Sequence, residues 1–155
     1  PNRYRQTLVQ IGAHLCPEPS RVPPLVSELF YNMQAIQNPV IRAIYFHHEL
    51  IRIHPFADGN GRVTRIAKNW MLMYDLYPPI FINDAPQKME YIATLGNSFR
   101  ELLIHPTKWN DFTDAFFQQE LDRLLINASL LYDSINRIGI NREEVDMHRE
   151  SKKEI

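Results

Sequence analysis

The sequence predicts a mainly α-helical bundle with one small β-hairpin near the N-terminus. Apolar residues recur every three or four positions over most of the chain from Pro23 to about Ile138, which is helical spacing. Asn-Pro, Pro-Pro and His-Pro pairs interrupt this recurrence and mark helix ends. Residues 4–19 do not show the helical spacing, and within them residues 7–16 carry a short β-prone run that ends at a glycine.

Length and composition predict one ordinary domain over residues 1–155. Apolar residues make up 45% of the chain and charged residues 23%, with a net charge of −1. A basic excess that would indicate nucleic-acid binding is absent. No apolar run is long enough to cross a membrane, and the single cysteine, Cys16, forms no internal disulfide. We therefore expect a cytoplasmic protein without a nucleic-acid or membrane partner. Because the chain begins without Met, we also expect it to be a fragment of a longer protein.

The N-terminal part is expected to form a hairpin followed by a helix. We call residues 7–16 the flap: a short β-prone run, a turn at Gly12, and a return that ends at Pro17. Two strands alone are marginally stable, so the flap is expected to lean on the helical body. Pro23 and Pro24 suit the start of a helix that ends before Asn38-Pro39.

Four further helices follow, separated by proline-containing breaks. They are expected at 40–53, 62–74, 86–104 and 109–138, the last as one helix or two in series, with an extended piece at 80–82. The third helix of the chain carries the apolar residues Ile66, Trp70, Met71 and Met73. Predicted core residues of the last two helices are Met89, Ile92, Leu95, Phe99, Leu102, Leu103, Phe112, Phe116, Leu121, Leu124, Leu125 and Leu131. The tail 141–155 carries many charges of both signs and is expected to be frayed or solvated helix.

The most chemically capable stretch is the motif loop, residues 54–65, with the sequence HPFADGNGRVTR. It lies between two predicted helices and opens the second. Free N–H groups at a helix start, with glycines that allow close approach, form an anion site. Arg62 and Arg65 lie about one helical turn apart and can face the same anion.

Simpler interpretations of this loop are also possible. Asp-Gly and Asn-Gly pairs also form ordinary turns. An EF-hand fails because Arg62 and Asn69 occupy ligand positions, and the Gly-Lys-Ser/Thr of a phosphate-binding loop is absent. A zinc-protease helix beginning at His48-Glu49 has Arg52 where the second histidine belongs. A metal cluster of His47, His48 and His54 remains a minor alternative, because no known ligand spacing completes it.

The motif loop resembles the signature of the Fic family (filamentation induced by cAMP), H-P-F-x-D/E-G-N-G-R-x-x-R, with every fixed position filled. Tyr4-Arg5 with residues 9–12, the segment 77–80 and the helix around Tyr91 also resemble the family, so the resemblance covers about Tyr4 to Leu103. It implies a Fic-type helical bundle with a target-docking flap. The implied activity is transfer of AMP from ATP to a Ser, Thr or Tyr hydroxyl of a target protein.

The resemblance also implies roles for individual residues. His54 is the general base, a role that suits an imidazole poised near neutral pH. Asp58 is the Mg²⁺ ligand, since a carboxylate is a hard oxygen donor. The other implied nucleotide contacts run from the α-phosphate to the base: Gly59, Asn60, Gly61, Arg62 (β-phosphate), Arg65 (γ-phosphate), Tyr91 near the adenosine, and Ile11 in the flap. Asn97 is one residue away from a family asparagine and is a weaker candidate.

Several alternatives stay open at this stage. Relatives with Lys in place of Gly61 transfer phosphate from ATP, other relatives transfer phosphocholine, and a catalytically idle module would only bind a nucleotide or partner. Many members are restrained by a Ser/Thr-x-x-x-Glu helix, and this sequence contains no such spacing. Inhibition is therefore expected from a missing segment in cis or from an antitoxin in trans, as in toxin–antitoxin pairs, unless the restraint does not exist. A homodimer is a further expectation from the family.

Overall fold

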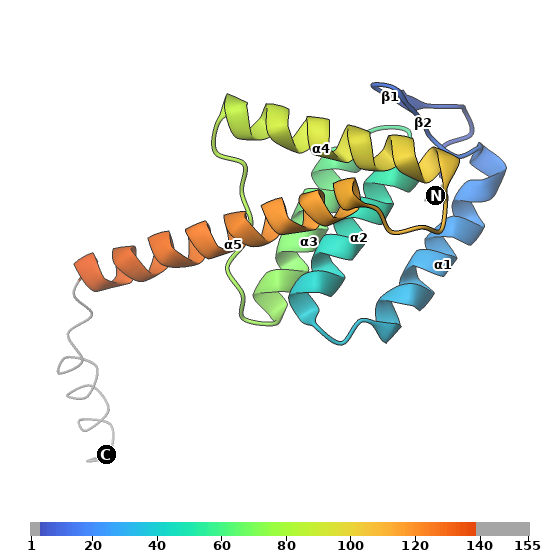
Figure 1. Cartoon of the computed structure of the whole chain (residues 1–155). Helices are drawn as coiled ribbons and strands as arrows, with labels where there is room; N and C mark the ends of the chain where they lie inside the picture. Colours follow the sequence, from blue (N-terminus) through green and yellow to red (C-terminus); the bar gives the residue numbers. More distant parts are fainter. Residues whose placement is uncertain (1–3, 139–155) are drawn as a thin grey trace, which may run out of the picture.

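The computed structural model describes residues 4–138, and the predicted charged tail 141–155 lies outside the described residues. The described chain is a helical bundle with one hairpin, as predicted (Figure 1). In chain order the elements are β1 (Gln10–Ile11), β2 (His14–Leu15), the 3₁₀-helix η1 (Pro19–Arg21), α1 (Val22–Ala35), α2 (Pro39–Ile53), α3 (Asn60–Tyr74), α4 (Ala85–Ile104) and α5 (Asp111–Ile138). Helix α5 is a single helix, and none of the described helices has the length and apolarity that crossing a membrane requires.

Local capping explains where two of the helices begin. Asn38 precedes Pro39, and its side-chain oxygen accepts hydrogen bonds from the backbone N–H groups of Val40 and Ile41. Asp84 accepts from the N–H of Gln87 in the same way at the start of α4. A cap of this kind contributes about 1 kcal/mol, so these starts are fixed by neighbours in the sequence.

The helices form two connected cores that share α2. Helix α2 packs against α1 on one side and α3 on the other, while α4 and α5 lie side by side across the bundle (Figure 1). The smaller core joins α1 to α2, and the larger one joins α2, α4 and α5. The flap leans on this body as expected: Ile11 packs against the larger core, and a His14 ring nitrogen lies 3.1 Å from the carbonyl oxygen of Arg52.

The predicted core of α4 and α5 was wrong at six positions. Met89, Ile92, Leu103, Phe112, Leu125 and Leu131 are all exposed. The buried face of α4 instead carries Tyr91, Leu95, Ser98 and Phe99. Helix α4 has more apolar residues than one face can bury. The face that is buried is the one that packs against α5, so apolarity alone does not predict it. Leu125 follows the buried Leu124 and faces outward, and the distal end of α5 extends past the other helices (Figure 1).

Helix α3 also turns an unexpected face inward. Its buried residues are Asn60, Thr64, Lys68 and Leu72, spaced four apart, whereas Ile66, Trp70 and Met73 are exposed. This orientation places Arg62 and Arg65 on the accessible side of the helix start. Of the buried polar residues, Lys68 joins α3 to α5 through an ion pair with Glu120.

Candidate active site

His54 lies at the junction between α2 and the motif loop. Its N–H donates to the Leu50 carbonyl at 3.0 Å, which closes the last turn of α2, and its backbone is left-handed with φ 52° and ψ 61°. A left-handed conformation costs a non-glycine residue roughly 1–2 kcal/mol. The chain therefore turns sharply at His54, and the loop that follows leaves the helix axis.

Asn60 fixes the shape of that loop. Its side-chain oxygen accepts from the Phe56 N–H at 2.8 Å, and its side-chain nitrogen donates to the Phe56 carbonyl at 2.7 Å. The residue is buried. Its side chain thus joins the start of the loop to the start of α3, a role that sequence reasoning missed. Direct contact of Asn60 with an α-phosphate stays a prediction.

The two glycines serve different geometric needs. Gly59 has φ 79°, a conformation that side chains rarely adopt, and it precedes α3 without providing a side-chain cap. A Cβ at Gly61 would lie 3.2 Å from Arg65 Nη1. The start of α3 is thus the positive end of a helix dipole without a side-chain cap, which is a favourable place for an anion.

The charged side chains of the loop are exposed. Asp58 and Arg62 form an ion pair of 3.1 Å while their side chains stay 91% and 70% exposed, so a ligand can separate them at little cost. Within residues 4–138, no three His, Cys, Asp or Glu side chains gather as a metal site. The minor alternative of a His47, His48 and His54 metal cluster is therefore wrong. Asp58 alone suits an ion that takes most of its other ligands from phosphate and water, as Mg²⁺ does.

The His54 ring is oriented by a hydrogen bond, and its pKa is lowered. Its Nδ1 lies 3.3 Å from the Ile51 carbonyl oxygen, which can only accept, so Nδ1 carries the proton in this hydrogen bond. Nε2 then holds a free lone pair. Partial burial lowers the pKa of His54 below its ordinary value, the positive charge of Arg5 adds to that effect, and the bond to Ile51 opposes it. The ring is thus available as a proton acceptor.

Tyr91 lies beside Arg65, in a cleft of about 800 Å³ between α3, residues 80–85 and α4. Its ring is buried, and its hydroxyl makes a 2.8 Å hydrogen bond to His47 Nε2. Burial raises the pKa of Tyr91 well above its ordinary value, and the neighbouring Arg65 opposes that rise. The structure therefore brings Tyr91 and Arg65 together. Ile11 and Asn97 are partly buried and do not line this cleft.

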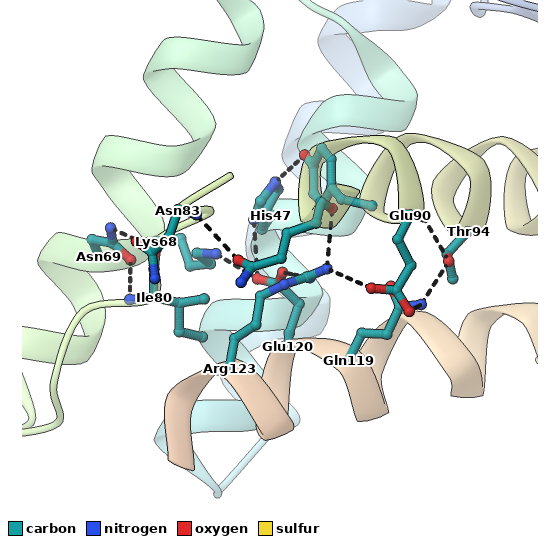
Figure 2. A network of polar contacts seen from close by, with 12 residues as sticks. His47, Lys68, Asn69, Ile80, Asn83, Glu90, Thr94, Gln119, Glu120 and Arg123 are labelled. Carbon is teal, nitrogen blue, oxygen red and sulfur yellow. Dashed lines mark hydrogen bonds and ion pairs between the residues drawn. The ribbon is translucent and has the colours of Figure 1, made fainter. Parts of the chain in front are cut away.

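A buried polar cluster under the cleft was not predicted. Figure 2 shows Glu120 of α5 with an ion pair to Lys68 of α3 and a second one, of 2.9 Å, to Arg123. His47 Nδ1 lies 3.8 Å from the Glu120 carboxylate. The one sequence signal was that Lys68 shares a helix face with Thr64 and Leu72. Arg5, also missed, is buried beside His54.

Comparison with known proteins identifies relatives of this arrangement. Residues 2–72 match the Fic/DOC family. A protein adenylyltransferase Fic of Culex quinquefasciatus is 39% identical over 83 residues, covering 51% of this chain and 17% of the relative. One of Drosophila grimshawi is 35% identical over 92 residues, covering 57% and 19%. The chain therefore spans less than a fifth of the length of these relatives.

Solved structures agree on the fold. A Fic domain containing signaling protein from Bacteroides thetaiotaomicron VPI-5482 superposes with a TM-score of 0.58 at 28% identity, over 86% of this chain and 52% of the other. Fic-1 from C. elegans gives a TM-score of 0.59 at 23% identity, over 85% and 38%. The second likeness shows the fold alone.

Proposed function

The chain belongs, through residues 2–72, to the Fic/DOC family, and from that premise we propose that it transfers AMP from ATP to a hydroxyl side chain of a target protein. The observation that carries the proposal is the position of His54. Its Nε2 makes no hydrogen bond within residues 4–138, and His54 opens the loop that leads into the first turn of α3, where a helix start favours phosphate.

In the proposed step the target hydroxyl oxygen attacks the α-phosphorus of ATP. A new oxygen–phosphorus bond forms, the bond from the α-phosphorus to the bridging oxygen breaks, and pyrophosphate leaves. The hydroxyl proton passes to Nε2 of His54, because Nδ1 already donates to the Ile51 carbonyl. General base catalysis of this kind contributes roughly 10²–10⁴-fold in rate.

The start of α3 and its two arginines would hold the triphosphate. The N–H groups beyond Gly59 and Gly61 approach the α-phosphate, while Arg62 and Arg65 bind the β- and γ-phosphates from the accessible face. Asp58 would hold Mg²⁺, which neutralises phosphate charge when bound. Catalysis is then mainly positioning and charge stabilisation, as in other phosphoryl-group transfers.

The surroundings support AMP as the transferred group. The cleft lined by Tyr91 and Arg65 has room for a nucleoside next to the phosphate site. Gly61 leaves open the space that lysine fills in the phosphate-transferring relatives. The exposed Gln10 of β1, next to Ile11, offers a strand edge to which a target segment could pair. These features favour an adenylyltransferase over a phosphotransferase.

The decisive experiment uses two labels of ATP with a cell lysate as the source of targets. We expect label from α-labelled ATP on protein, none from γ-labelled ATP, and at least a hundredfold loss in His54→Ala. His105→Ala is the matched control, because His105 is an exposed histidine that follows α4 and is no part of the motif loop. Label from the γ position alone would establish phosphate transfer. Nucleotide binding without either label would establish an idle module.

A further inference from the structure

A buried arginine joins the flap to His54. Arg5 precedes the flap and is only 2% exposed, yet within residues 4–138 no carboxylate is among its hydrogen-bond partners. Its Nε donates to the His54 carbonyl at 2.7 Å, and its two terminal nitrogens donate to the carbonyls of Thr7, Ile53 and Pro17. The Arg5 backbone N–H also donates to the Pro55 carbonyl at 2.8 Å.

These acceptors belong to two parts of the site. Thr7 and Pro17 flank the hairpin on either side, whereas Ile53, His54 and Pro55 form the end of α2 and the start of the motif loop. The last carbonyls of a helix lack intrahelical donors and form the negative end of its dipole. The guanidinium satisfies two of them and thereby holds the left-handed turn at His54.

We propose that Arg5 is the positioning residue of the site: its guanidinium fixes the backbone of His54 and both ends of the flap in one rigid arrangement. The proposal rests on the proposed function, because it concerns the alignment of His54 with the hydroxyl of a target segment that pairs with the flap. The side chain of Arg5 donates to backbone carbonyls and not to the His54 ring, so it acts through the backbone of His54 and of the flap.

The geometry requires arginine rather than any cation. A guanidinium has five donors in a fixed plane, and here they serve four carbonyls from two segments. A lysine has the same charge but a single nitrogen, which cannot reach all of these acceptors. Arg5→Lys therefore removes the connection between the two segments while keeping a positive charge beside His54.

The test compares Arg5→Lys with Arg123→Lys, a matched control in which a second buried arginine is changed in the core of α5. Both variants are assayed at a temperature where they are folded, with α-labelled ATP and a lysate. For Arg5→Lys we expect the apparent kcat to fall about ten- to a hundredfold, because misplacement of reacting groups by about 1 Å has such effects. The KM for ATP stays within about threefold, since the phosphate site is untouched. Arg123→Lys keeps the kcat of the wild-type protein.

Hydrogen exchange provides a readout that does not depend on activity. Residues 4–17 and 52–58 should lose protection together in Arg5→Lys, whereas α4 and α5 keep theirs. In the wild-type protein these two segments should open at the same rate, a measurement that remains possible if the variant does not fold. An unchanged kcat, or independent opening of the two segments, overturns the inference. If the wild-type protein transfers no label, the proposed function fails, and hydrogen exchange alone decides whether Arg5 couples the segments.

Discussion

Lys68 of α3 and Glu120 of α5 form an ion pair that is almost completely buried, with exposed fractions of 2% and 0%. It joins the helix that carries Arg62 and Arg65 to the α4–α5 layer (Figure 2). The Glu120 carboxylate also binds Arg123 and lies near His47, so one anion holds together side chains from three helices. Taking one charge away leaves the others uncompensated in a dry environment.

We therefore expect Glu120→Gln to lower the free energy of unfolding by about 3–5 kcal/mol, the usual result of breaking a buried pair. The double change Lys68→Met with Glu120→Leu should recover part of this loss, since it removes both the lysine and the carboxylate, while Arg123 keeps its 3.7 Å ion pair with Glu90. Denaturant unfolding of the single and double variants measures the difference. A single variant within about 1 kcal/mol of the wild-type protein would contradict this account of the cluster.

On the acid side of its pH profile, the rate of the transfer reaction should fall only below the ordinary pKa of histidine. Partial burial lowers the pKa of His54, so the ring stays neutral and able to accept a proton at a pH where a free histidine is charged. The rate should fall only as the pH drops through this lowered pKa. The check is the pH dependence of kcat with α-labelled ATP, paired with an NMR titration of the His54 ring. A fall in kcat whose midpoint lies at or above pH 6.5 would contradict the prediction.

The stability of the fold should decline on acidification because of His47. Its complete burial, with Lys68 nearby, lowers the pKa of His47 well below 6.5 in the folded protein. The unfolded chain then binds more protons, and stability that is present above pH 6.5 is lost as the pH falls toward the folded pKa. Urea unfolding between pH 7.5 and 5 measures the slope. His47→Gln should flatten it only in part, because burial also lowers the pKa values of His54 and His14 and these two groups add to the slope in the same direction. An unchanged slope in His47→Gln would contradict the contribution of His47.

Glu49 titrates outside the pH range of that measurement. Burial alone would raise the pKa of Glu49, but the hydrogen bonds from His48 and Arg52 outweigh this effect and lower the pKa to about 2 in the folded protein. Its contribution to stability is therefore lost only below pH 4.5, outside the range used for His47.

Substitutions at the two motif glycines should separate stability from activity. Gly59→Ala forces a side chain into the left-handed region, so we expect a loss of about 1–2 kcal/mol in the free energy of unfolding. Gly61→Ala meets only the flexible end of Arg65, and stability should change by less than about 1 kcal/mol. Transfer should nevertheless fall about tenfold or more, because Arg65 is displaced from the phosphate site. Thermal unfolding and the labelled-ATP assay distinguish the two effects.

Much of the fold was predictable because its signals are local. Asn38 and Asp84 cap helices through atoms two or three positions away, and prolines end them. The motif loop could also be recognised from the sequence, since the twelve positions of residues 54–65 are contiguous. What failed was the choice of buried face: Met89 and Leu125 are as apolar as Leu95 and Leu124, but only the second pair meets another helix.

The sequence by itself determined the helical class, the flap, the helix limits and the residues of the candidate site, because these depend on spacing and on neighbours within a few residues. The tertiary structure decided that Arg5 holds the backbone of His54 across 49 positions and that Lys68 meets Glu120 across 52. Such partners are chosen by which helices pack together, and a buried charge must find its partner wherever the fold has placed one.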